Sequence, residues 1–161
     1  MQACIHAGIH THTQVAGGLL AAGAQADERD HSQDTALHLA SLYGHADVIQ
    51  KLLAAHAEVD ARNLDNITAL HNAIAFAHTQ AAALLLDAGA DTNIADAEGN
   101  TPLHTAIMVG RVDMVSCLLA HEADCMRVNA AGLSAYKSAR LHNTNPQVTR
   151  IDGRKRVCEC A

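Results

Sequence analysis

The sequence predicts an all-α protein made of stacked helix-turn-helix repeats. Three observations support this fold class. Residues of the same type recur along the 161-residue chain at a constant step, which is the signature of a repeat protein. Within each step, apolar residues follow the spacing of short helices. Hydrophobic residues make up 49% of the chain and aromatic residues only 2%, so the core must be aliphatic and rich in alanine.

The repeat step is 33 residues, and several sets of positions keep it in phase. The clearest sets are Thr35, Thr68, Thr101 and Ser134; Leu37, Leu70, Leu103 and Tyr136; His38, His71, His104 and Lys137; and Leu19, Leu52, Leu85 and Leu118. They divide a single domain, 1–161, into an incomplete repeat 1–29, full repeats 30–62, 63–95 and 96–128, and a divergent repeat 129–161 with a basic tail. One such helix pair cannot cover its own apolar face, so neighbouring repeats must bury one another.

Each full repeat is predicted to contain two short helices. In repeat 96–128, Thr101 stands directly before Pro102, which suits an N-cap followed by the first helical position. Gly110 is expected to end this helix, and the apolar stripe of the second helix runs from Val112 to Leu119. The polar stretch 91–101 connects this helix pair to the preceding repeat.

The second helix of each repeat is expected to end on a residue in the left-handed conformation. Gly23 and Gly89 occupy this position in two repeats, where glycine adopts it without strain. His56 and Glu122 occupy it in two others, and a side chain there costs about 1 kcal/mol. We therefore expect the corners at His56 and Glu122 to be the softer ones.

The short motifs inside the repeats resemble those of ankyrin repeats. They are TALH at 35–38 and 68–71, TPLH at 101–104 and LLLDAGAD at 84–91. The resemblance covers nearly the whole chain and implies an ankyrin-repeat solenoid. Each unit would be L-shaped, with two antiparallel helices and a projecting short β-hairpin loop. The resemblance also implies a non-catalytic protein, without a cofactor, that binds other proteins.

An apolar row marks the predicted binding surface. Tyr43, Phe76 and Val109 lie one repeat apart, late in the first helices, beside Leu42 and Met108. The resemblance implies that first-helix faces and hairpin tips form a groove for a protein partner, although packing between repeats is the competing explanation. The tip residues that we assign to this groove are His31, Ser32, Asp34, Leu64, Asp65, Ile67, Glu98 and Asn100. The acidic tips favour a basic partner, since they would steer it electrostatically.

Two other functions are weighed against this one. The same fold serves inhibitors of transcription factors and of cell-cycle kinases, but no residue of this chain is diagnostic of either. The 12 histidines raise a metal-binding hypothesis, because His6 and His10 share a helix face near Cys4 and His12. Spacing fixes no third ligand, so we expect no metal site there, and we expect 158–160 (Cys-Glu-Cys) to be a plain tail. No phosphate-binding loop, nucleophile elbow or zinc-protease motif indicates an enzyme.

Charge and cysteine usage limit the partner and the compartment. The net charge is −6, with 15 acidic and 4 basic residues in 1–126 but 2 acidic and 7 basic residues in 127–161. This balance argues against a nucleic-acid partner, and we expect the basic cluster Arg150, Arg154, Lys155 and Arg156 to be a solvated end. No apolar run of about 18 residues indicates a membrane span. Five cysteines without a CxxC pair favour a reducing compartment, the cytoplasm or the nucleus, and we expect a monomer.

Asn93 is a candidate modification site. It lies in Asp91-Thr92-Asn93, eight residues after Leu85. This placement resembles the asparagine that is hydroxylated in many ankyrin repeats. The equivalent positions of the other repeats hold Asp27, Asp60 and Met126, so Asn93 alone qualifies.

Overall fold

The computed structural model describes residues 18, 23 and 25–141. The chain forms two compact units, an N-terminal unit of residues 1–91 and a C-terminal unit of residues 92–161. The described helices of the N-terminal unit are α2 (Ala36–Leu42), α3 (Ala46–Ala54), α4 (Ala69–Ala75) and α5 (Thr79–Asp87). Those of the C-terminal unit are α6 (Pro102–Met108), α7 (Val112–Ala120) and α8 (Ala135–Leu141). The predicted all-α fold built from helix pairs is confirmed.

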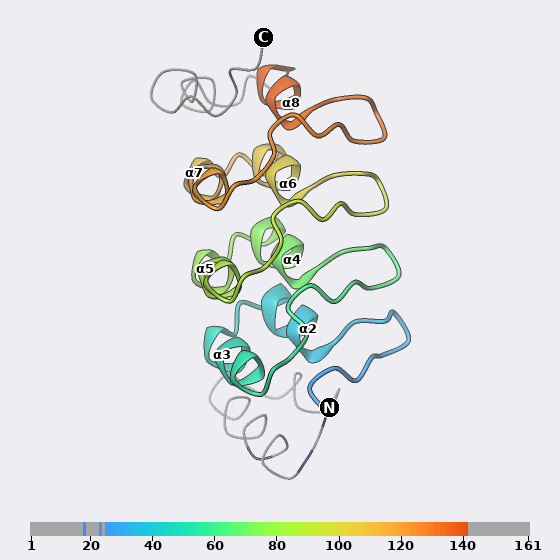
Figure 1. The fold of residues 1–161 in the computed structure, drawn as a ribbon, viewed down its shortest axis with the longest axis vertical. Helices are drawn as coiled ribbons and strands as arrows, with labels where there is room; N and C mark the ends of the chain where they lie inside the picture. Colours follow the sequence, from blue (N-terminus) through green and yellow to red (C-terminus); the bar gives the residue numbers. More distant parts are fainter. Residues whose placement is uncertain (1–17, 19–22, 24, 142–161) are drawn as a thin grey trace. The chain divides into compact units, whose positions relative to one another are not determined.

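Within the N-terminal unit, the first helices of successive repeats pack side by side, as do the second helices (Figure 1). α2 packs on α4 and α3 packs on α5. Ala40 and Ala73 are fully buried, and their small side chains let α2 and α4 approach closely. Leu52 in α3 and Leu85 in α5 are also fully buried. The aliphatic, alanine-rich core that the composition predicts is therefore present.

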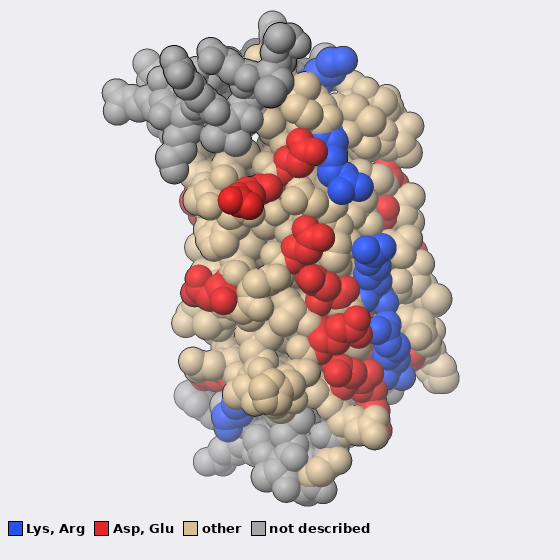
Figure 2. Space-filling view, viewed as in Figure 1, with Lys and Arg blue, Asp and Glu red and all other residues tan. Residues whose placement is uncertain are grey.

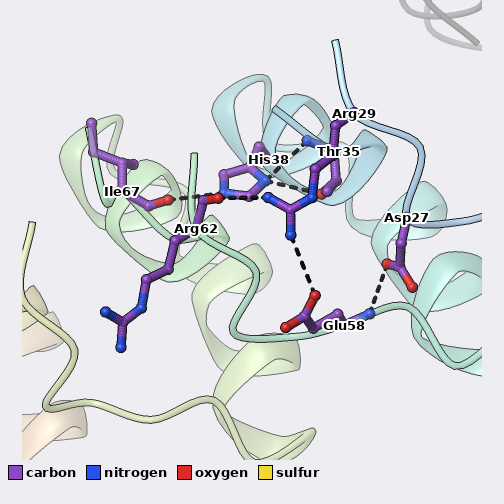
Figure 3. Close-up of polar contacts among 7 residues, drawn as sticks. All are labelled: Asp27, Arg29, Thr35, His38, Glu58, Arg62 and Ile67. Carbon is purple, nitrogen blue, oxygen red and sulfur yellow. Dashed lines mark hydrogen bonds and ion pairs between the residues drawn. The ribbon is translucent and has the colours of Figure 1, made fainter. Parts of the chain in front are cut away.

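The threonine and histidine of each repeat motif form a structural clamp. The Thr35 hydroxyl lies 2.9 Å from Nδ1 of His38, and the Thr35 backbone N–H donates to the same nitrogen. Because Nδ1 accepts, Nε2 carries the proton and donates to the Ile67 carbonyl at 2.9 Å, in the next repeat (Figure 3). In the C-terminal unit, His104 donates in the same way to the Leu133 carbonyl at 3.1 Å. The motif thus caps a helix and joins two repeats.

The predicted left-handed corners are confirmed. His56 and Glu122 have φ angles of 59° and 61°, and Gly89 has 86° at the equivalent position. Gly110, which ends α6, has a φ of 74°. The structure adds a corner that sequence analysis missed, because Ala77 has a φ of 62° at the position of Gly44 and Gly110. With Gln33 and Asn66 in the loops, five described residues with side chains therefore hold positions that favour glycine.

The projecting loops differ from the predicted β-hairpins. Within residues 25–141 they contain no strand, and their one bridge is the isolated antiparallel pair Val128–Ser134. Each loop is closed by a backbone bond and by one side chain: the Asp30 N–H donates to the Asp34 carbonyl at 3.0 Å, and the Asp30 carboxylate accepts from the backbone N–H groups of Ser32 and Asp34, at 2.8 and 2.9 Å. Asn63, Asp96 and Asn129 repeat this arrangement. These side-chain bonds add to the backbone bonds of each loop, because aspartate and asparagine bond readily to nearby backbone N–H groups.

Candidate functional site

The ring row of the N-terminal unit consists of Tyr43 and Phe76. They are the C-cap residues of α2 and α4, so both lie at the same end of two helices that pack side by side. Tyr43 is 51% exposed and Phe76 is 56% exposed. Rings that served only to pack one repeat on the next would be expected to bury more of their surface. Their exposure favours the surface function over the packing explanation.

Two histidine rings, those of His45 and His78, make close contacts next to this row. The His45 ring stacks on the Tyr43 ring, with 6.1 Å between centroids. The His78 ring donates from Nε2 to the Leu42 carbonyl at 3.1 Å, and the ring lies so close to Gly44 that a Cβ there would collide with it. Nε2 must donate in this pair, since a carbonyl can only accept. Leu42 itself is half-buried, so it supports the row more than it projects from it. Sequence analysis missed His45 and His78, although they too lie one repeat apart.

The predicted tip residues of the N-terminal unit fall into two groups. His31, Ser32, Asp65 and Leu64 are exposed, and Leu64 reaches 69%. The other two hold the loop together. The Asp34 carboxylate accepts from the Asn63 amide at 2.9 Å. Half-buried Ile67 donates its N–H to Asn63, and its carbonyl accepts from His38.

The C-terminal unit carries the remaining predicted residues. Met108 and Val109 are exposed at the end of α6, and Glu98 is exposed at its loop tip. Asn100 is only 4% exposed, and its side chain bonds to Asp96, Glu98 and Asn129. It therefore shapes the loop from inside.

Met126 and Val128 are exposed apolar residues that sequence analysis missed. Met126 is 56% exposed and Val128 is 61% exposed. The signal for Val128 was present in the repeat alignment, because its equivalent positions hold Arg29 and Arg62 in two repeats and Ala95 in the third. An apolar residue that replaces arginines at one repeat position marks a change in the surface.

Charged groups of the N-terminal unit also connect its repeats. The Asp27 carboxylate accepts from the Glu58 N–H at 2.8 Å. The Arg29 guanidinium donates to the Arg62 carbonyl at 2.7 Å and pairs with the Glu58 carboxylate at 3.4 Å (Figure 3). Figure 2 shows acidic side chains of this unit lying next to basic ones. Part of this acidic surface is therefore neutralised within the unit.

Burial disfavours the charged form of two of the motif histidines. Burial lowers the pKa of His38, against opposing contributions from its bond to the Ile67 carbonyl and from Asp34 nearby. Burial likewise lowers the pKa of His104, against its bond to the Leu133 carbonyl and the charge of Asp96. Protonation of Nδ1 would place a donor against the threonine N–H that now donates to it. These rings are structural, as their place in the motif predicts.

The metal-binding hypothesis and the interpretation of the cysteines depend partly on residues outside the described part of the chain. Within the described residues, no group of three or more His, Cys, Asp or Glu side chains could hold a metal ion. Cys4, His6, His10, His12, the tail 158–160 and the basic cluster lie outside the described residues. Cys117 keeps its thiol, whereas Cys125 is disulfide-bonded, a bond that the count and spacing of the cysteines did not indicate. In the described part of the chain, each helix is too short or too polar to cross a membrane.

Asn93 lies half-buried in the C-terminal unit and links two of its repeats. Its side-chain carbonyl accepts from the Asp124 N–H at 2.8 Å, and its amide donates to the Glu122 carbonyl at 3.5 Å. Hydroxylation of Asn93 stays a prediction. Incubation with the asparaginyl hydroxylase, followed by mass spectrometry of the peptide, tests it, and an unchanged peptide mass would contradict it.

The repeated helix pairs define the chain as a repeat protein, and residues that differ between its repeats lie on the surface. Comparison with protein families agrees: a model for ankyrin repeats in three copies matches residues 51–129, and a model for ankyrin repeats in many copies matches residues 19–73. The chain belongs to the ankyrin-repeat family. Among curated proteins, no sequence matches it. Ankyrin repeats mediate protein–protein interaction, and the family is generally non-enzymatic.

Proposed function

We propose that the chain is a non-catalytic interaction module whose main contact with a protein partner is the ring row of the N-terminal unit. The observation that carries this proposal is the exposure of Tyr43 and Phe76 at equivalent ends of two packed helices. Large aromatic side chains at the centre of an interface commonly dominate its binding energy. Leu64, Asp65, His31 and Ser32 are the tip residues that surround the row in this proposal.

The contacts of His45 and His78 next to the row support this assignment. A side chain contributes more to binding affinity when it loses little conformational freedom on binding. A rigid support for the rings therefore favours affinity. The His45 ring against Tyr43 and the His78 ring against Gly44 provide such a support. Met108 and Val109 are exposed in the C-terminal unit, and they are proposed as a separate apolar contact with a partner.

The experiment combines stability with affinity. A partner is isolated with the full chain by pull-down, and its affinity is measured for Tyr43→Ala, Phe76→Ala and the exposed control Gln50→Ala. If the rings are anchors, the affinity falls at least about tenfold per ring while the thermal midpoint moves little. The control should leave both quantities unchanged.

The opposite pattern would end the proposal. If the rings only pack the repeats, each ring variant lowers the melting midpoint sharply, and the folded fraction keeps its affinity. The same variants thus separate the surface function from the packing explanation.

A further inference from the structure

The N-terminal unit is far more acidic than the C-terminal unit. Residues 25–91 contain 10 acidic and 3 basic residues, a net charge of −7 with neutral histidines. Residues 92–141 contain 5 acidic and 4 basic residues, a net charge of −1. Most of the negative charge of the described chain therefore belongs to the unit that carries the ring row.

Three basic residues oppose this charge within the N-terminal unit. Arg29 donates to the Arg62 carbonyl and pairs with the Glu58 carboxylate. Lys51 lies in the last turn of α3, one helical turn after Asp47. The unit nevertheless keeps a net charge of −7.

Two exposed carboxylates stand close in the sequence to exposed apolar residues. Asp47 is exposed in the first turn of α3, directly after the turn that follows Tyr43. Asp65 is exposed at a loop tip beside Leu64, which is the most exposed apolar residue of the unit. Aromatic faces themselves attract cations. The N-terminal unit thus combines exposed apolar side chains and ring faces with a net negative charge.

We propose that the occupant of the ring row is a lysine- or arginine-rich segment of a protein partner. This inference rests on the proposed function and adds the chemistry of the partner. Basic side chains would meet Asp47, Asp65 and the ring faces, and the apolar parts of the segment would cover Phe76 and Leu64. The net charge of the unit would speed encounter with such a segment and repel nucleic acids and acidic peptides.

Peptide selection tests the inference without a known partner. Random dodecapeptides are displayed and selected on the full chain, then depleted on the Tyr43→Ser/Phe76→Ser double variant. Peptides that bind the chain but not the variant are the ring-dependent binders. We expect them to be enriched in Lys and Arg over the starting library and to weaken strongly as salt rises from about 0.05 to 0.3 M, because screening shortens the range of the attraction.

Two matched charge variants locate the attraction. Asp47→Asn/Asp65→Asn and Glu28→Gln/Asp87→Asn remove the same charge from exposed positions of the same unit. The first should weaken the ring-dependent binders about three- to tenfold, and the second should change affinity by less than half as much. Equal effects of the two pairs would overturn the inference.

The outcomes separate this inference from the proposed function. Ring-dependent binders that are neutral or acidic overturn the basic partner and keep the interaction module. Duplex DNA that binds the ring row also overturns it. The absence of any ring-dependent binder, while the double variant stays folded, contradicts the proposed function itself.

Discussion

The N-terminal unit exposes Tyr43 and Phe76 where the C-terminal unit exposes Val109, and it carries a net charge of −7 against −1. The hydrogen bonds that hold the two units are nevertheless the same. Thr35 and His38 repeat as Thr101 and His104, with matching distances. Positions that form the repeat and positions that face solvent are therefore separate, and only the second set distinguishes the two units.

The largest expected effect concerns the shared core. Leu85→Ala in the N-terminal unit and Leu118→Ala in the C-terminal unit each remove a fully buried side chain. Each should lower the free energy of unfolding by about 2–5 kcal/mol in urea titrations. Exposed Leu64→Ala is the control and should stay within about 0.5 kcal/mol. If Leu64→Ala lowers the free energy of unfolding as much as Leu85→Ala does, the distinction between core and surface positions is contradicted.

Acid should weaken both units through their motif histidines. The pKa values of His38 and His104 are lowered in the folded chain, while the unfolded chain takes up protons near pH 6.5. Their stabilising contribution is complete above pH 6.5 and is lost as the pH falls from there toward the folded pKa. The free energy of unfolding should then fall by at most about 1.4 kcal/mol per pH unit for each ring.

Imidazole NMR signals measure this titration directly. At pH 6 the His38 and His104 rings should remain neutral, with the proton on Nε2. A midpoint at or above 6.5 for either ring would contradict the prediction. Agreement in one ring only would show that the clamp differs between the units.

A buried hydroxyl distinguishes α2 from its counterparts. Ser41 is fully buried, and within the described residues its Oγ is the one buried side-chain polar atom without a hydrogen bond. Ser41→Ala should raise the free energy of unfolding by about 1 kcal/mol, because an unsatisfied buried group is removed. The matched control is Ser134→Ala, which removes an oxygen that accepts from the Lys137 N–H and should cost about 1 kcal/mol. A loss of stability in both variants would refute the prediction for Ser41.

The smallest expected effect lies at the corners. His56→Gly and Glu122→Gly should each raise the free energy of unfolding by up to about 1 kcal/mol, because both residues have positive φ angles. Ala55→Gly is the control, since Ala55 has a φ of −88° and should lose stability on this change. Thermal and urea midpoints compare the three variants. A decrease for His56→Gly would show that its side chain makes a contact worth more than the strain.

The fold was predictable because its signals are local. Thr101 with Pro102, Gly110 and the apolar stripe of α7 each act within one repeat, so the sequence predicts their helices closely. The loops were less predictable. Asp30 and its equivalents close them through side-chain bonds, and the predicted strands do not form in the described residues.

The sequence by itself determined the repeat step, the helix pairs and the left-handed corners, because these depend on hydrogen bonds and sterics of neighbouring residues. Only the tertiary structure decided which residues face solvent. Asn100 and Leu64 were both predicted at loop tips, yet Asn100 is buried by its bonds to Asp96 and Asn129 while Leu64 is exposed. Exposure depends on what the next repeat places against a side chain, and that contact is not encoded in the residue's own neighbours.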